Sequence, residues 1–352
     1  PVTVPPAPVE GEVGLTDDQR RKRQVADELA EYGLVEALTY PFVGDEDYRA
    51  FAYDADEIKR VSVEIANPLA GDRPFLRRDI LPTLAQTVRL NLRRGLENVS
   101  LYEIGHVYLW DPQAPAIPAL PGGVRPTDEQ LAALDAGLPA QPMHVAGILT
   151  GNAVETGWLG ERRAVDWSDA VEAVRRISDR LGADLMLDQP APDDVPAQWH
   201  PGRMARVLAG QTAVGVVGEL HPHVNEALGF PAHSAAFELD LTALFAALDN
   251  APVQARPIST FPPVKQDLAF TVPRSVTAAA LESVIREAAG EVLESIELFD
   301  VFTGDQVGEG MKSLAYAVTF RAVDRTLGSE DSETIRKAII DRAAELGAQL
   351  RA

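Results

Sequence analysis

The segment Lys312-Ser-Leu-Ala-Tyr-Ala-Val-Thr-Phe-Arg321 alternates without a break between large apolar residues and small or hydroxylic ones. The large residues occupy the even positions from Leu314 to Phe320, and the small ones occupy the odd positions from Ser313 to Thr319. Successive side chains of a β-strand point to opposite faces of its sheet. The alternation therefore predicts a strand that buries one face against helices and leaves a flat face of small residues open.

The elements around this strand predict its fold. Strand patterns run at 266–272, 293–302 and 348–351, and helix patterns run at 277–289 and 329–346. The resulting order is βαββαβ, which is a ferredoxin-like arrangement. The strand at 293–302 shows no clean parity, so we infer a bulge or an edge twist there, and periodicity alone does not place Asp300.

The open face of this sheet consists mainly of Ala, Ser and Thr, as Ala269, Thr271 and Ala315 illustrate. Such a face accepts planar bases or another protein, and it also occurs as an ordinary solvated surface. The sequence lacks the aromatic pair on which an RNA-recognition motif stacks bases, so that class is disfavoured.

A larger region that mixes helices and strands precedes this domain. Its expected elements are helices near 16–33, 80–96 and 166–181 and strands at 99–110, 145–150, 206–209, 213–220 and 235–241. Residues 44–56 are polar, and the alternation at 60–65 predicts a short strand. Thr16 and Gln19 have the spacing of a capping box. The basic cluster at 20–23 indicates a solvated helix face, with a contact to RNA or to an acidic partner as the alternative.

Proline-rich stretches delimit the expected domains. Residues 1–8 hold four prolines, and residues 251–263 hold four more. Such composition is typical of linkers. We therefore expect a linker or tail of an upstream domain at 1–14, a core at 15–250, a linker at 251–263 and a last domain at 264–352.

Composition limits the classes of function. The 352 residues carry a net charge of −21 at pH 7 and no cysteine, which excludes disulfides, thiolate metal ligands and a cysteine nucleophile. The acidity argues against a general coat for nucleic acid or anionic membranes, and no apolar run approaches the roughly 20 residues of a membrane span. The net charge is −17 before residue 253 but only −4 after it, so a local contact with RNA fits the last domain best.

The sequence contains no catalytic motif for nucleotides, metalloproteases or serine hydrolases. His200, His221 and His223 each lie next to a proline or one residue away from it. We interpret them as turn residues whose rings hydrogen-bond to the backbone, in preference to a metal site with Glu219.

Two groups of segments carry a family resemblance. In the last domain they are Ser259-Thr-Phe-Pro-Pro-Val-Lys-Gln-Asp-Leu-Ala-Phe, Leu298-Phe-Asp-Val-Phe-Thr-Gly, Gly308-Glu-Gly-Met-Lys-Ser-Leu-Ala-Tyr and Phe320-Arg-Ala-Val-Asp-Arg-Thr-Leu. Upstream they are Ala66-Asn-Pro-Leu, Leu76-Arg-Arg-Asp-Ile-Leu-Pro, Leu101-Tyr-Glu-Ile-Gly, His200-Pro-Gly-Arg and Gly218-Glu-Leu-His-Pro. The first group resembles the ferredoxin-fold anticodon-binding domain of the bacterial phenylalanyl-tRNA synthetase β subunit. The second resembles the synthetase-like core of the same subunit.

The resemblance implies an α+β chain, with a class II synthetase-like antiparallel-sheet core followed by the ferredoxin-like domain. It implies a non-catalytic subunit that scaffolds the catalytic α subunit in an (αβ)₂ heterotetramer and binds the anticodon of tRNA(Phe) in the cytoplasm. The whole enzyme uses ATP and Mg²⁺. This chain is expected to bind neither, to hold no metal, to contact no membrane and to be inactive alone.

The chain departs from the full family pattern, because no tRNA-binding, editing or magnesium-cluster domain precedes Thr16. Together with a first residue that is Pro1 and not Met, this indicates a fragment or a processed form. Editing and the magnesium site are therefore not assigned to it.

The resemblance implies site residues only where its motifs align. It implies that Asp300, Ser313 and Arg351 contact the anticodon bases. Phosphate contacts are expected from Lys265, Lys312 and Arg321. The alternative for the three phosphate residues is an ordinary charged surface.

Two other functions remain open at this stage. One is a stand-alone regulatory protein that binds a small effector, which would require a polar pocket with convergent charges. The other is an RNA-binding protein that has no catalytic partner.

Overall fold

The computed structural model describes residues 14–158, 160–248 and 258–351. The chain divides into two compact units, Pro1–Asp249 and Asn250–Ala352, and each is described here by itself. Of the expected tail, 1–13 lie outside the described residues, as do 251–257 of the expected linker.

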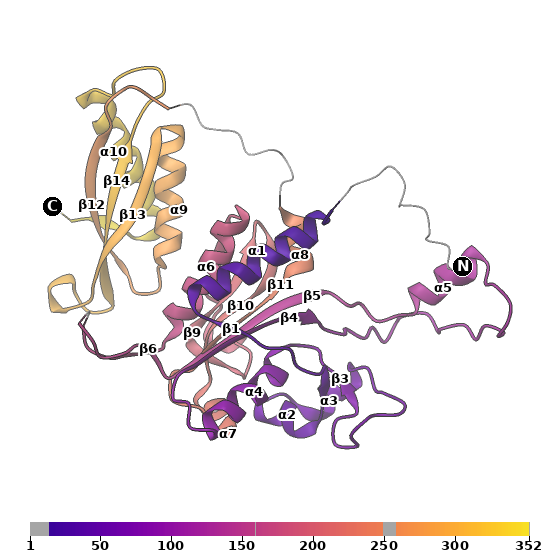
Figure 1. Ribbon diagram of the computed structural model, residues 1–352. Coiled ribbons are helices and arrows are strands. Elements are labelled where there is room, and N and C mark those ends of the chain that lie inside the picture. The colour runs from indigo at the N-terminus through magenta and orange to yellow at the C-terminus, as the bar shows by residue number, and fades with distance from the viewer. Residues whose placement is uncertain (1–13, 159, 249–257, 352) are drawn as a thin grey trace. The chain divides into compact units, whose positions relative to one another are not determined.

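The first unit is built on a large mixed sheet (Figure 1). Its helices are α1 (Asp17–Tyr32), α2 (Asp45–Ala50), α3 (Ala55–Arg60), α4 (Leu81–Arg93), α5 (Asp128–Ala136), α6 (Trp167–Leu181), α7 (Pro222–Leu228) and α8 (Leu241–Ala247). The strands of the large sheet are β1 (Val35–Glu36), β4 (Val99–His106), β5 (Met143–Thr150), β8 (Leu185–Asp188), β9 (Trp199–Ala209), β10 (Thr212–Leu220) and β11 (Ala235–Asp240). Two small two-stranded sheets pair β2 (Phe42–Val43) with β3 (Phe75–Leu76) and β6 (Asn152–Val154) with β7 (Arg163–Ala164).

The large sheet has the order β1-β4-β5-β11-β10-β9-β8. Its strands pair antiparallel except for β1, which runs parallel to β4. Helices α1, α6 and α8 cover one face and build one apolar core, and α4 and α7 build the second core on the other face (Figure 1). A largely antiparallel sheet between two helical layers agrees with the expected core.

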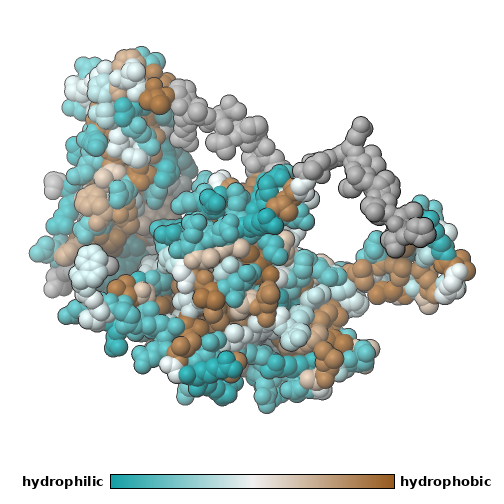
Figure 2. All heavy atoms as spheres, in the orientation of Figure 1, coloured by the Kyte–Doolittle hydropathy of each residue, from teal (hydrophilic) through white to brown (hydrophobic). Residues whose placement is uncertain are grey.

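Helix α1 begins and ends as its sequence predicts. The Thr16 hydroxyl accepts from the Gln19 N–H over 3.2 Å, the Gln19 side chain accepts from the Thr16 N–H over 3.0 Å, and Gly33 ends the helix at φ 104°. Arg20 pairs with Asp17, and Arg21 packs over the Phe245 ring of α8. Hydrophilic atoms cover the visible side of α1 (Figure 2). Arg20, Lys22 and Arg23 are exposed, whereas the Arg21 side chain is only 16 % exposed, and a contact of this cluster with RNA or an acidic partner stays a prediction.

One expectation for the first unit is wrong, because 60–65 holds one bridging residue, Glu64, in place of a strand. The polar segment 44–56 forms α2 and the start of α3. The Asp54 carboxylate caps α3 by accepting from the N–H groups of Asp56 and Glu57. Acidic residues in the first turns of α2 and α3 stabilise these helix starts.

The second unit has the βαββαβ order that its sequence predicts. Its elements are β12 (Val264–Pro273), α9 (Ala278–Ala289), β13 (Leu293–Phe302), β14 (Met311–Phe320), α10 (Ser329–Ala343) and β15 (Gln349–Leu350). The sheet order is β13-β14-β12-β15, with every pairing antiparallel. Apolar residues of α9 and α10 pack on the even-numbered side chains of β12 and β14. The opposite face of the sheet is therefore the open one.

Across the described ranges, the structure has no helix with the length and apolar character that a membrane span requires.

Candidate functional site

Asp300 and Arg351 lie on one line across the four-stranded sheet. Asp300 of β13 is in register with Ala315 of β14, which is in register with Ala269 of β12. The Arg351 N–H donates to the Ala269 carbonyl oxygen over 2.7 Å, so Arg351 ends the line beyond β15. Asp300 and Arg351 are exposed. The two alanines between these charged residues keep the surface flat.

A second line runs beside the first. Phe302 of β13 is in register with Ser313, Ser313 with Thr271, and Thr271 with Gln349. Residues two apart on a strand share a face, so both lines belong to the open face. Ser313 is only 4 % exposed, between its two cross-strand neighbours, whereas Phe302 is 38 % exposed. The floor of the second line is therefore a hydroxyl with an aromatic ring at one side.

A bulge in β13 brings Asp300 and Phe302 to this face. The register with β14 shifts between Leu298 and Asp300, which leaves Phe299 as the extra residue. Before the bulge an odd residue, Glu297, is opposite the open-face Ala317, and after it the even residues are opposite open-face positions. The inferred irregularity in this strand is confirmed, and it explains why simple alternation did not place Asp300.

The three residues expected at phosphates lie in different places. Lys265 is exposed and in register with Thr319 on the open face. Lys312 is in register with the buried Val272 on the helix-covered side, and burial lowers the pKa of its ammonium group. Arg321 is held at the end of β14, where it pairs with Glu294 over 3.0 Å and donates to the Phe261 carbonyl oxygen over 2.7 Å.

Phe302 is the residue that sequence reasoning missed on this face. The family segment with Asp300 contains it, but an unplaced bulge left its direction undefined. The available signal was the spacing of two from Asp300, because any strand that turns Asp300 outward turns Phe302 outward as well.

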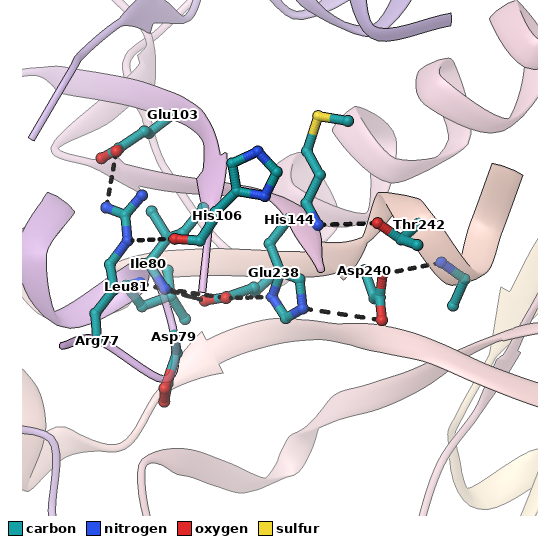
Figure 3. A network of polar contacts seen from close by, with 12 residues as sticks. Arg77, Asp79, Ile80, Leu81, Glu103, His106, His144, Glu238, Asp240 and Thr242 are labelled. Carbon is teal, nitrogen blue, oxygen red and sulfur yellow. Dashed lines mark hydrogen bonds and ion pairs between the residues drawn. The ribbon is translucent and has the colours of Figure 1, made fainter. Parts of the chain in front are cut away.

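In the first unit, two of the quoted motifs meet at a buried ion pair (Figure 3). The Arg77 guanidinium donates to Glu103 over 2.8 Å, and the side chains of both are 3 % exposed. Arg77 also donates to the Thr39 and Thr83 hydroxyls over 3.0 Å each and to the His106 carbonyl oxygen over 3.0 Å. The pair ties β4 to the start of α4, so both motifs have a structural role.

Two more quoted motifs meet at Glu219. Arg203 Nε lies 2.8 Å from Glu219 Oε2, and His233 Nδ1 lies 3.1 Å from the same oxygen. His200 Nδ1 accepts the Gly202 N–H over 3.1 Å, and His221 Nδ1 accepts the His223 N–H over 3.2 Å. The expected hydrogen bonds between the backbone and the rings of His200 and His221 are therefore confirmed, but His200 lies within strand β9 and not in a turn, and His221 caps the start of α7. In the described part of the chain, no three His, Cys, Asp or Glu side chains are placed to hold a metal ion.

Comparisons with known proteins cover both units. Residues 1–241 match the family model of the phenylalanyl tRNA synthetase beta chain CLM domain, and residues 259–351 match that of the ferredoxin-fold anticodon binding domain. A phenylalanine–tRNA ligase beta subunit of Bifidobacterium longum is 76 % identical over 352 residues, which are 100 % of this chain and 40 % of that protein. One of Thermobifida fusca is 44 % identical over 346 residues, 96 % of this chain and 41 % of that protein. The chain thus spans about two fifths of these curated relatives.

Among solved structures, a pyrrolysyl tRNA synthetase of Desulfitobacterium hafniense matches 64 % of this chain and 66 % of its own. The TM-score is 0.43 at 14 % sequence identity, a likeness too distant to bear on function.

Proposed function

Because the chain belongs to the family of phenylalanyl-tRNA synthetase beta chains, we propose that it binds the anticodon of tRNA(Phe) and scaffolds the catalytic α subunit. In this proposal it acts during the ATP-dependent attachment of phenylalanine to tRNA. The observation that carries the proposal is the line from Asp300 to Arg351 across the open face.

The chemistry of this face suits base edges. The Asp300 carboxylate accepts from amino and imino groups, the Ser313 hydroxyl both donates and accepts, and the Arg351 guanidinium donates in a fixed fork. Neighbouring strands are about 4.8 Å apart, so the line from β13 to β15 is roughly 14 Å long. That length accommodates more than one base, with opposite charges at the two ends.

Stacking and phosphate contacts complete the proposed interface. Phe302 is exposed beside Ser313, and aromatic side chains stack on single-stranded bases without regard to sequence. Lys265 is the open-face cation in register with Thr319 and is proposed to contact a phosphate. Lys312 and Arg321 reach phosphates only from the rim, because Lys312 is partly buried on the helix-covered side and Arg321 is paired with Glu294.

An exposed apolar surface in the first unit supports a protein partner. Val35 of the edge strand β1 is 62 % exposed, and Leu38 and Tyr40 just after it are 84 % and 80 % exposed. Exposed sheet edges and apolar patches mark interaction surfaces. We assign this surface, Val35, Leu38 and Tyr40, to the α subunit within an (αβ)₂ heterotetramer.

Catalysis lies outside this chain in the proposal. No residue of the chain is assigned to ATP, Mg²⁺ or phenylalanine, all of which the whole enzyme uses. The chain acts in the cytoplasm, and its contribution to the reaction is to position tRNA and the partner.

The interface is tested with the Arg351→Ala variant, assembled with the α subunit. Loss of a charged hydrogen bond should weaken tRNA(Phe) binding by about 1.5–3 kcal/mol, measured by filter binding at fixed salt. The control is Arg336→Ala, which removes an exposed arginine from α10 on the opposite side of the sheet. Equal affinities for the two variants would refute the assignment of Arg351.

The partner surface is tested by the double variant Leu38→Asp with Tyr40→Asp. Two carboxylates at the centre of a buried apolar contact should abolish co-elution with the α subunit in size-exclusion chromatography. The control is Val124→Asp, an apolar residue that is 65 % exposed elsewhere in the same unit. If the double variant still co-elutes with the α subunit, the assigned surface is wrong.

A further inference from the structure

A cavity of about 460 Å³ lies in the first unit beside the start of α4. Polar groups from separate elements converge on it, and the lining includes Tyr53, Asp79, His144, Gln198, Trp199 and Glu238. Its volume falls in the range of sites for small organic molecules, roughly 300–1,000 Å³. Binding of a small effector requires a pocket with convergent charges. This cavity contains neither the Arg77–Glu103 pair nor any residue of the open face of the second unit.

Glu238 is already satisfied by protein groups (Figure 3). Its carboxylate accepts the Ile80 N–H over 3.0 Å, the Leu81 N–H over 3.2 Å and His144 Nδ1 over 2.8 Å. Burial opposes the charged form of His144, but the hydrogen bond and charge of Glu238 raise its pKa above the usual value. Glu238 and His144 therefore form a pair that balances its own charge at the end of α4.

One carboxylate oxygen of Asp79 accepts no hydrogen bond from the described residues. Its Oδ2 accepts the Tyr53 hydroxyl, which in turn accepts from Gln198 Nε2 over 3.3 Å. Its Oδ1 is buried and has no hydrogen-bond partner among the described residues. The carboxylate points away from the Glu238–His144 pair in Figure 3. A buried carboxylate oxygen without a donor is costly, so the position calls for a donor from outside the chain.

The charged and apolar residues that line the cavity indicate which kind of molecule could supply this donor. Three carboxylates line it, those of Asp79, Glu238 and Asp240, against the two cationic groups of Arg78 and His144. The balance favours a monocation. Since no described cluster of three His, Cys, Asp or Glu is placed to hold a metal ion, an organic cation fits better. Leu81, Leu109 and Val216 supply an apolar wall for its body.

We propose that this cavity binds a small primary amine in its ammonium form, with the ammonium group on Asp79 and the apolar body against Leu81 and Trp199. The site is separate from the proposed tRNA and partner surfaces. Its success or failure therefore leaves those assignments unchanged.

The proposal is tested by calorimetry with benzylammonium on the full chain at pH 8. Benzyl alcohol, which has the same apolar body without the charge, should bind at least tenfold more weakly. Asp79→Asn should weaken benzylammonium binding at least tenfold, because the amide keeps the contact to Tyr53 but lacks the charge. The matched control is Asp184→Asn, which removes an exposed carboxylate outside the cavity and should leave the affinity unchanged.

A second measurement keeps the test decisive if Asp79→Asn alters the fold. Burial and the neighbouring Glu238 raise the pKa of Asp79 to about 7. The charged or titratable groups that face Asp79 are Tyr53 and Arg78 from its own layer and His144 and Glu238 from the sheet. Benzylammonium affinity of the unchanged chain should fall about tenfold from pH 8 to pH 6, because the ionised fraction of Asp79 falls from about nine tenths to one tenth. An affinity that does not depend on pH, or benzyl alcohol binding as tightly as benzylammonium, would overturn the proposal.

Discussion

The two units use arginine and carboxylate side chains in opposite ways. In the first unit Arg77 and Glu103 are buried in contact, and Arg77 also donates to two hydroxyls and a carbonyl oxygen. In the second unit Asp300 and Arg351 are separated by two strands and exposed. The first arrangement directs its hydrogen bonds to groups inside the protein, whereas the exposed side chains of the second can bind a ligand.

This difference follows from where each side chain lies. A buried charge must be paired, because leaving it unpaired costs several kcal/mol. An exposed charge is solvated by water and can exchange water for the edge of a base at little cost. The same residue types therefore indicate stability in one unit and recognition in the other, and only their burial distinguishes the two roles.

The largest effect is expected where the buried pair is broken. Arg77→Met leaves Glu103 buried without its cation and should lower the free energy of unfolding of the first unit by about 3–5 kcal/mol. All four tryptophans lie in the first unit, so denaturant unfolding followed by tryptophan fluorescence reports on this unit alone.

The control for that comparison is an exposed pair in the same unit. Arg206 lies 2.5 Å from Asp188, with side chains 50 % and 42 % exposed. Arg206→Met should cost no more than about 1 kcal/mol, because exposed ion pairs contribute little. Similar losses for the two variants would show that burial does not separate these arginines.

A smaller effect is expected on the open face. Phe302→Ala should weaken tRNA(Phe) binding by about 1–3 kcal/mol, the contribution of one stacked base, with little change in folding because the ring is 38 % exposed. Filter binding measures the loss, and Phe302→Tyr should retain affinity because it keeps the ring. If removal of the ring leaves affinity unchanged, stacking on Phe302 is excluded.

The smallest effect is expected at Asp79, which lines the cavity of the first unit. One of its carboxylate oxygens accepts a hydrogen bond and the other does not. Burial and Glu238 raise the pKa of Asp79 to about 7. Stability from such a group is complete below its unfolded pKa and is lost as pH rises through its folded pKa. Asp79→Asn does not titrate, so its stability relative to the unchanged chain should rise between pH 6 and pH 8 by about 1–2 kcal/mol. Urea unfolding at the two pH values measures the change, and a constant difference would contradict it.

Sequence alone predicted what local pattern determines. The alternation in β14 defined the buried and open faces, and the βαββαβ order followed from helix and strand periods. The caps Thr16 and Gly33 were readable because a cap depends on residues three or four apart. The family segments led to Asp300, Ser313 and Arg351, although their proposed roles await the binding experiment.

What sequence did not predict depends on distant contacts. The pairing of Arg77 with Glu103 joins residues 26 apart, and no spacing rule relates them. The direction of Asp300 depended on a one-residue shift against β14. Polar composition alone did not predict a structure for 44–56, although this segment contains the acidic starts of α2 and α3. The carboxylate cavity brings together residues 53–240 and has no local signature.

The buried Arg77–Glu103 pair also limits which residues can replace Gly105. A Cβ atom at this position would lie 2.2 Å from Arg77 Nη2, so an alanine here requires the guanidinium to shift from its place beside Glu103. Replacing Arg77 alone leaves Glu103 without its cation, and replacing Glu103 alone leaves the arginine unpaired. The three positions are therefore coupled, and the destabilisation caused by replacing two of them together should differ from the sum of the two single effects.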